Sequence, residues 1–223
     1  MIYDTCANLV AENKETENYN NFEFELIRFS STSSPFNEEE FKSKTQEELT
    51  DELYQVVYKH YKEKIERNAI AAYPVIKDVY EKQGSQYERI VVPFTDGVKT
   101  IQVVTNLKDA YESKGEVLVT DFEKNVTLSI IDDTWKDHLR QMDDLKQSVR
   151  NAQYEQKDPL LIYKFESFEL FNTMLNKVNK EVLSFLFKGE LPTKGADQVS
   201  QAREPRRDKV QLTKEEYQSQ STS

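Results

Sequence analysis

The feature that most constrains this fold is a short break between two long stretches of helical periodicity. Apolar residues recur every three or four positions up to Val149, with no glycine or proline among them, and recur again after Pro159. The break, residues 153–159, is polar. Two such stretches with a short link can bury their apolar stripes only by folding back on each other, so the sequence predicts an antiparallel helical hairpin. The expected stripes are Leu128, Ile131, Trp135, Leu139, Met142, Leu145 and Val149, and then Leu161, Phe165, Phe168, Phe171, Leu175, Val178, Val182 and Phe185.

The turn of this hairpin is expected to be exposed, because ~30 residues of helix make a rod of about 45 Å that outreaches a compact core. Asp158 suits the N-cap of the second helix, and Pro159 suits its first position. Tyr154 has the form of a contact residue, since its rigid ring carries one hydrogen-bonding end. Alternatively, Tyr154 packs back on the loop. The other expected contact residues are Arg150, Gln153, Gln156 and Lys157.

The first half of the chain carries shorter patterns. Residues 1–10 place apolar side chains on one helical face, whereas residues 21–29 alternate apolar and acidic side chains, which predicts a strand. A capping box at Thr45 predicts the start of a long helix. This helix is expected to kink or restart at Pro74 and to stop near Gly84.

A β-hairpin is predicted next in the chain. Two β-branched runs, residues 88–94 and 98–104, flank an Asp-Gly pair at 96–97 that supplies the positive φ angles of a tight turn. Pro93 should lie where its missing amide faces outward or where the ladder has ended. Residues 106–114 follow as a short helix. The predicted fold class is therefore mainly α, with a small β-hairpin and a long antiparallel helical hairpin.

Composition excludes several classes of function. The net charge of −10 argues against a chain that wraps nucleic acid. Cys6 is the only cysteine, which leaves no internal disulfide and no Cys-rich zinc site. No apolar run approaches the ~18 residues of a membrane span. Residues 1–10 lack the pattern of a signal peptide, so a cytoplasmic protein is expected.

Candidate catalytic and metal-binding residues are present, but their arrangement does not favour chemistry. Five aspartates between positions 132 and 144 alternate with basic residues along one helix. That pattern is typical of a solvated or docking face rather than of two carboxylates that face each other across a cleft. His138 has no cysteine or second histidine nearby, so a packed imidazole is favoured over a metal ligand. We therefore expect no catalytic residue, no metal site and no cofactor within this chain.

Five short motifs follow one another through the helical hairpin. They are Phe122-Glu123-Lys124, Ile131-Asp132-Asp133-Thr134-Trp135-Lys136-Asp137-His138-Leu139, Met142-Asp143-Asp144-Leu145, Tyr154-Glu155-Gln156-Lys157-Asp158-Pro159 and Tyr163-Lys164-Phe165-Glu166-Ser167-Phe168. In order and spacing, residues 118–188 resemble the C-terminal region of SecA, the family of bacterial preprotein translocase motors. The combination of motifs is specific, whereas residues 1–117 match the family more loosely.

The resemblance implies a domain organisation and a role. Residues 1–20 would be the end of a scaffold helix with a linker, and residues 21–117 the helical wing domain. Residues 118–192 would be the two-helix finger of the helical scaffold domain, followed by a disordered tail over residues 193–223. In this family the tip of the finger, matched here by Tyr154, lies at the cytoplasmic mouth of the protein-conducting channel and touches the moving polypeptide.

The resemblance also implies partners and cofactors. ATP and Mg²⁺ belong to the motor domains of the family, and this chain has no G-x-x-x-x-G-K-[ST] phosphate loop. The implied partners are the SecY-type channel, the unfolded preprotein and the motor domains of the same protein, which the finger restrains until a substrate arrives. Peripheral association with the inner membrane is implied for the intact motor, and no nucleic acid is.

The sequence departs from the family at the tip. The family usually has Leu-Arg-Gly before the tip tyrosine, whereas this chain has Asn151-Ala152-Gln153, which moves the basic charge to Arg150 and Lys157. The Cys-rich zinc tail of many members is not in this sequence. Two other classes stay open on composition: a helical adaptor that only scaffolds other proteins, and a stand-alone enzyme, which the residues favour least.

Overall fold

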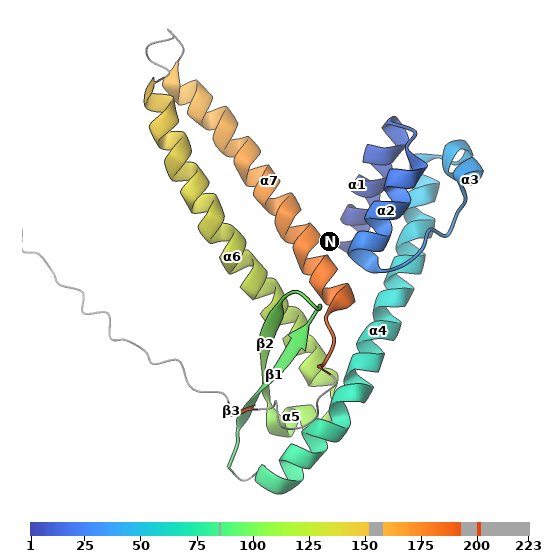
Figure 1. The fold of residues 1–223 in the computed structure, drawn as a ribbon, viewed down its shortest axis with the longest axis vertical. Helices are drawn as coiled ribbons and strands as arrows, with labels where there is room; N and C mark the ends of the chain where they lie inside the picture. Colours follow the sequence, from blue (N-terminus) through green and yellow to red (C-terminus); the bar gives the residue numbers. More distant parts are fainter. Residues whose placement is uncertain (85, 152–157, 193–199, 202–223) are drawn as a thin grey trace, which may run out of the picture.

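The structure is a computed structural model that describes residues 1–84, 86–151, 158–192 and 200–201. Two arms diverge from a common base (Figure 1). One arm is the helical hairpin of α6 and α7, and the other is the long helix α4 with α1, α2 and α3 beside it. The elements are α1 (Ile2–Glu15), α2 (Tyr19–Ser30), α3 (Glu38–Ser43), α4 (Gln46–Gln83), β1 (Arg89–Thr95), β2 (Thr100–Asn106), α5 (Leu107–Glu112), α6 (Glu116–Asn151), α7 (Pro159–Lys188) and β3 (Ser200–Gln201).

Helix α2 corrects the strand predicted between Asn21 and Phe29. Phe22, Leu26 and Phe29 are buried, a spacing of four and then three residues that puts them on one helical face. Phe24, which the strand pattern grouped with them, is exposed. Over so short a segment, the apolar positions fit both the period of a helix and that of a strand. Contacts with the rest of the protein favour the helix, since Phe29 packs edge-on against the ring of Phe187 from α7, 5.9 Å away.

Helix α4 begins at the predicted capping box. The Thr45 amide donates to the Glu48 carboxylate at 2.9 Å, and the Glu48 amide donates to the Thr45 hydroxyl at 3.3 Å. The sequence predicted that the helix would kink or restart at Pro74. It does not restart there and continues to Gln83. Pro74 removes the amide that would bond the carbonyl of Ile70. Ile70 is exposed, so water can take the place of that donor.

The predicted β-hairpin is confirmed, although Gly97 alone of the Asp96-Gly97 pair takes a positive φ, of +90°. β1 and β2 pair antiparallel from Arg89 opposite Asn106 to Thr95 opposite Thr100. The Asp96 amide donates to the Lys99 carbonyl at 3.2 Å, and this fixes which residues bond across the pair. Successive amides of a strand face opposite edges, and the amide of Asp96 faces β2. Position 93, three residues earlier, therefore faces away from β2, as predicted for Pro93.

The segment after α7 returns to that outer edge of β1. Glu190 and Thr95 exchange two backbone hydrogen bonds of 2.9 Å each. The two residues of β3 then pair with β1, giving the strand order β2-β1-β3. The prediction of a disordered tail over residues 193–223 is therefore wrong for Ser200–Gln201. The remaining residues of that segment lie outside the described part of the chain.

One buried core joins the two arms at their base. It runs from α1 and α2 through α4, the sheet and α5 into the first half of α6 and the second half of α7. The fold is mainly α with a small β-hairpin, as predicted. The half of the α6–α7 hairpin that carries the turn stands clear of this core (Figure 1).

The junction between α5 and α6 requires a glycine, which gives a first test of the fold. Gly115 has a φ of +95°, and a Cβ added there would lie 2.8 Å from the carbonyl oxygen of Ala69 in α4. We expect Gly115→Ala to lower the free energy of unfolding by about 2–3 kcal/mol in urea titrations, because backbone strain adds to a clash with rigid backbone.

Gly97 provides the matched control for that substitution. It has a φ of +90°, but nothing lies within 4 Å of an added Cβ. Gly97→Ala should therefore cost only the strain, about 1 kcal/mol. Equal losses at the two glycines would show that the close approach of α4 contributes nothing.

Candidate functional site

The helical hairpin predicted from the sequence is confirmed. α6 and α7 run antiparallel side by side, and the chain reverses between Asn151 and Pro159 (Figure 1). Asp158 caps α7 by accepting a hydrogen bond of 2.9 Å from the Leu160 amide, and Pro159 occupies the start of the helix, both as predicted. A single uninterrupted helix through this region is thereby excluded.

The predicted contact residues lie at the edge of the described chain or outside it. Gln153, Tyr154, Gln156 and Lys157 are outside the described residues, and Arg150 is placed only as a residue in the last turn of α6. Projection of Tyr154 at the apex therefore stays a prediction. The helix ends that flank it lie at the far end of the arm from the sheet (Figure 1).

The seam between α6 and α7 uses only some of the side chains predicted for it, among them Leu145, Val149, Val178, Val182 and Phe185. Trp135, Leu139, Phe165 and Phe168 were expected to be buried there, but they are 44%, 49%, 62% and 65% exposed. Met142 is half-buried. Each helix has a wider apolar sector than one neighbouring helix can cover, so packing had to select one edge of each sector. The buried residues are Phe122, Val126, Ile130, Thr134, His138, Leu145 and Val149 on α6, and Met174, Val178, Val182 and Phe185 on α7.

The unburied parts of these sectors form one surface, which we call the apolar face. Trp135 lies three residues before the buried His138, and Leu139 lies one residue after it. Around the helix axis, both side chains are therefore rotated from His138 in the same direction, by about 60° and about 100°. Phe171 bears the same relation to the buried Met174. Because the helices are antiparallel, equal rotations bring both sets to the same side of the hairpin. The apolar face comprises Leu128, Ile131, Trp135, Leu139, Leu161, Phe165, Phe168, Phe171 and Leu175, all exposed.

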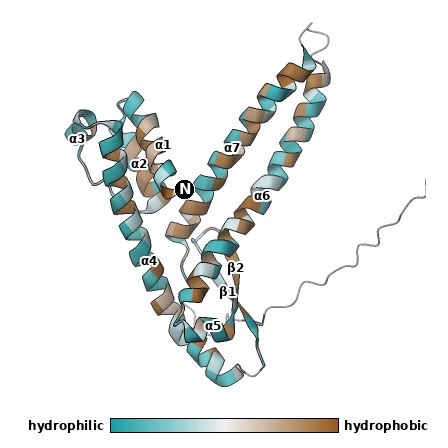
Figure 2. Cartoon of the chain, turned by 180° about the vertical axis from the view of Figure 1, so that it is seen from behind, coloured by the Kyte–Doolittle hydropathy of each residue, from teal (hydrophilic) through white to brown (hydrophobic). Residues whose placement is uncertain are grey.

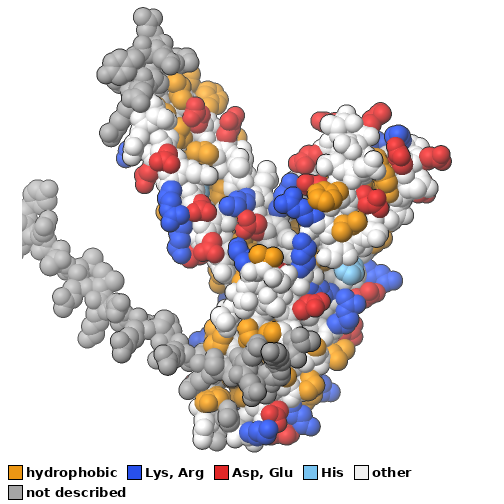
Figure 3. Space-filling view, viewed as in Figure 1, with side chains coloured by type: hydrophobic (Ala, Val, Ile, Leu, Met, Phe, Trp, Pro, Cys, Tyr) orange, Lys and Arg blue, Asp and Glu red, His pale blue; other side chains and the backbone are white. Residues whose placement is uncertain are grey.

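The apolar face continues almost to the turn. Hydrophobic segments of α6 and α7 reach the grey tip in the hydropathy view (Figure 2), and hydrophobic side chains are visible at the surface beside it (Figure 3). Large exposed apolar side chains that gather on one side of a hairpin are typical of a site that contacts another protein or another part of the same protein. Within the described ranges, no helix is both long enough and apolar enough to cross a membrane.

His138 lies in the seam at the border of the apolar face. Its ring centroid is 5.5 Å from that of Trp135 and 6.0 Å from that of Phe171. Its Nδ1 atom is buried and has no hydrogen-bond partner among the described residues. Those residues also contain no group of three or more side chains suited to hold a metal ion. The imidazole is thus packed between an aromatic ring of α6 and one of α7.

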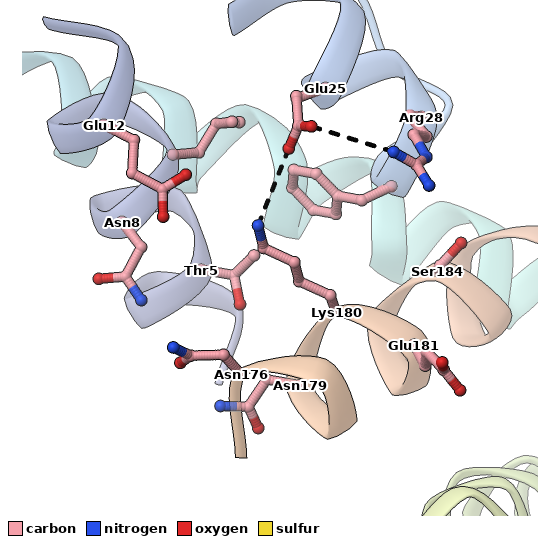
Figure 4. A pocket seen from close by; sticks show the side chains of 12 residues that line it. Thr5, Asn8, Glu12, Glu25, Arg28, Asn176, Asn179, Lys180, Glu181 and Ser184 are labelled. Atoms are coloured by element: carbon pink, nitrogen blue, oxygen red, sulfur yellow. Dashed lines mark ion pairs between the residues drawn. The ribbon is translucent and has the colours of Figure 1, made fainter. Parts of the chain in front are cut away.

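A polar pocket of about 250 Å³ lies where α7 passes α1 and α2 (Figure 4). Lys180 of α7 reaches Glu25 of α2 at 3.9 Å, and Glu25 also pairs with Arg28 at 4.0 Å. Basic side chains gather on this part of the surface (Figure 3). These pairs are partly exposed, so each contributes little to stability. The pocket marks a contact between the two arms.

The sequence analysis missed a polar contact between α4 and the base of the hairpin. Lys64 and Asn68 are buried, and they donate hydrogen bonds to the carbonyls of Phe187 and Gly189. Next to them, the Tyr61 hydroxyl donates to the Glu123 carboxylate at 2.6 Å. Spacing could have signalled these residues, because positions 57, 61, 64 and 68 continue the buried stripe of α4. A lysine and an asparagine therefore stand where apolar residues are expected.

Comparisons with known proteins agree with the hairpin and its motifs. The model of the SecA Wing and Scaffold domain matches residues 1–190. The protein translocase subunit SecA of Christiangramia forsetii is 57% identical over 217 residues, which cover 97% of this chain and 19% of that protein. The SecA subunits of Flavobacterium psychrophilum and Bacteroides thetaiotaomicron are 57% and 44% identical, over 86% and 94% of this chain and 17% and 18% of their own length.

The matches cover most of this chain but only a small part of each relative. No solved structure matches the chain. The chain spans about a fifth of the length of the curated relatives it matches, so they identify a region rather than a whole protein. The family model covers both the arm formed by α4 with α1–α3 and the whole of the α6–α7 hairpin. The chain belongs to the SecA family, and it corresponds to the wing and scaffold region of these translocase subunits.

Proposed function

We propose that this chain is the mechanical arm of an ATP-driven preprotein translocase motor. The observation that supports the proposal best is the α6–α7 hairpin, hereafter the finger, whose described helix ends Asn151 and Pro159 lie away from the core. The sequence between these ends holds most of the predicted contact residues. In the proposal, Tyr154 touches the moving polypeptide through its ring and hydroxyl, a contact that tolerates many sequences. Arg150, Gln153, Gln156 and Lys157 would complete the contact with the polypeptide or with a SecY-type channel.

The apolar face gives the finger a second proposed role. Its large exposed side chains suit a stable contact with the motor domains of the same protein, through which the finger would restrain the ATPase. ATP and Mg²⁺ would bind in those domains. The 223-residue chain by itself is expected to release no phosphate from ATP above background. In the intact motor we propose a cytoplasmic location with peripheral attachment at the inner membrane.

Substitution at the tip tests the contact with the polypeptide. In the intact motor, Tyr154→Ala is expected to slow preprotein translocation several-fold while the affinity for nucleotide stays unchanged, because nucleotide is proposed to bind in the separate motor domains. Tyr154→Phe keeps the ring and should keep most of the rate. Equal translocation rates for the alanine variant and the wild type would remove Tyr154 from the mechanism.

An adaptor that only scaffolds other proteins is the second candidate, and the apolar face is the observation that favours it. A photocrosslinker at position 154 distinguishes the two. Capture of a stalled preprotein supports the translocase arm, whereas capture of fixed partners alone supports the adaptor.

A further inference from the structure

The base of the finger is attached to α4 by polar groups in an otherwise apolar core. Lys64 is 3% exposed and Asn68 is 7% exposed. The surroundings are aromatic, since the Phe187 ring lies 5.3 Å from that of Tyr61 and 6.2 Å from that of His60. An apolar side chain at position 64 would be the ordinary choice in such a place.

Both polar side chains bond the end of α7. Lys64 Nζ donates to the carbonyl oxygen of Phe187, and Asn68 Nδ2 donates to that of Gly189 at 3.2 Å. The carbonyls at the carboxyl end of a helix lack donors within the helix, and the helix dipole makes this end negative. A Cβ at Gly189 would lie 2.8 Å from the carbonyl oxygen of Phe185 and 3.1 Å from the Phe122 ring, so a glycine suits the close packing of α6 against this end of α7. Two side chains from α4 therefore replace water around the last turn of the finger.

The charge on Lys64 does not serve stability. The charged groups that act on it are Glu190, which follows α7, and Arg67 of α4; Glu123 of α6 is occupied by the Tyr61 hydroxyl. Burial lowers the pKa of Lys64 to about 8 despite the attraction of Glu190. A folded state that lowers the pKa of a lysine disfavours its ammonium form. Buried charges of this kind are commonly replaced by apolar residues without loss of stability.

We propose that Lys64 and Asn68 are positioning residues, which form a clasp that fixes the direction of the finger relative to the wing. Hydrogen bonds are directional, whereas the aromatic contacts around Phe187 tolerate rotation of α7. The clasp thus gives an otherwise apolar joint a defined angle. Its mechanical use rests on the proposed function, but its existence does not.

Distance measurements on the full 223-residue chain test the clasp directly. Spin labels at Gln55→Cys on α4 and Asn172→Cys on α7, both exposed positions, are introduced in a Cys6→Ala background. The wild-type clasp should give one narrow distance distribution in pulsed electron resonance, and Lys64→Met and Asn68→Ala should broaden it. Lys180→Met is the matched control, because it removes an exposed ion pair between the same two arms. Narrow distributions in both clasp variants would overturn the proposal, and Asn68→Ala decides alone if Lys64→Met fails to fold.

The pH dependence of unfolding separates positioning from simple packing. The pKa of Lys64 is about 8 in the folded chain, compared with 10.5 for a fully hydrated lysine side chain, so the folded chain releases this proton first. The stability of the wild type should therefore rise relative to that of Lys64→Met as pH increases from 8 to about 10.5. At pH 7 the methionine variant should melt no lower than the wild type. A clearly lower melting temperature at pH 7 with an unbroadened distance distribution would show that the amine group of Lys64 stabilises the fold without orienting the finger. If a clasp variant broadens the distance distribution but the intact motor that carries it translocates preprotein normally, the result would count against the proposed function and not against the clasp.

Discussion

Phe122→Ala is expected to lower the free energy of unfolding by about 3–5 kcal/mol, the largest loss from a single substitution that we predict for this chain. The Phe122 side chain is fully buried where three elements meet. Its ring centroid is 4.3 Å from that of Phe94 in β1 and 6.3 Å from that of Phe185 in α7. Removing the ring leaves a cavity that the sheet and both helices of the finger share, and none of them can close it alone. Urea unfolding followed by circular dichroism measures the loss.

Phe168→Ala is the matched control for that prediction. It removes the same ring from the same hairpin at a position that is 65% exposed. The loss should stay within about 0.5 kcal/mol, because little apolar surface returns to water. If the two substitutions cost the same, the core assigned to the base of the finger is wrong.

Leu139→Lys combined with Phe168→Lys is expected to raise the basal ATPase rate of the intact motor several-fold while the isolated chain unfolds at an unchanged denaturant concentration. Both positions lie on the apolar face and are exposed in this chain. If the motor domains cover that face, each leucine or phenylalanine there contributes about 1.5–3 kcal/mol of burial, which two charges would cancel. The finger would then no longer restrain the ATPase.

Asn172→Lys provides the comparison for the double variant, because it adds a charge to an exposed polar position of α7. It should leave the ATPase rate unchanged. An unchanged rate in the double variant as well would mean that the motor does not use the apolar face. A fall in the stability of the isolated chain would mean instead that the two residues are part of its own core.

Local chemistry alone predicted where several elements begin and end. The Asp96-Gly97 pair specified the turn of the β-hairpin, and the capping boxes and caps at Thr45 and Asp158 marked the starts of α4 and α7. Each signal involves groups a few residues apart that satisfy one another whatever else the chain does. The family motifs are equally local, which is why the resemblance could be stated from sequence and the comparisons then agreed with it.

The helical hairpin also followed from sequence, but only part of its interior did. Periodicity shows that a helix has an apolar sector, and a break between two such helices implies that they fold back. It does not show which edge of the sector meets the partner. Trp135, Leu139, Phe165 and Phe168 were placed in the seam for that reason, and the structure leaves them on the apolar face.

The sequence by itself therefore determined the mainly helical class, the β-hairpin, the long paired helices and the family. Only the tertiary structure decided that residues 19–30 are a helix, that one side of the finger stays exposed, and that Lys64 and Asn68 join α4 to the end of α7. Caps and turns depend on neighbours along the chain, whereas burial and the pairing of buried polar groups depend on elements more than a hundred residues away, such as Lys64 and Phe187.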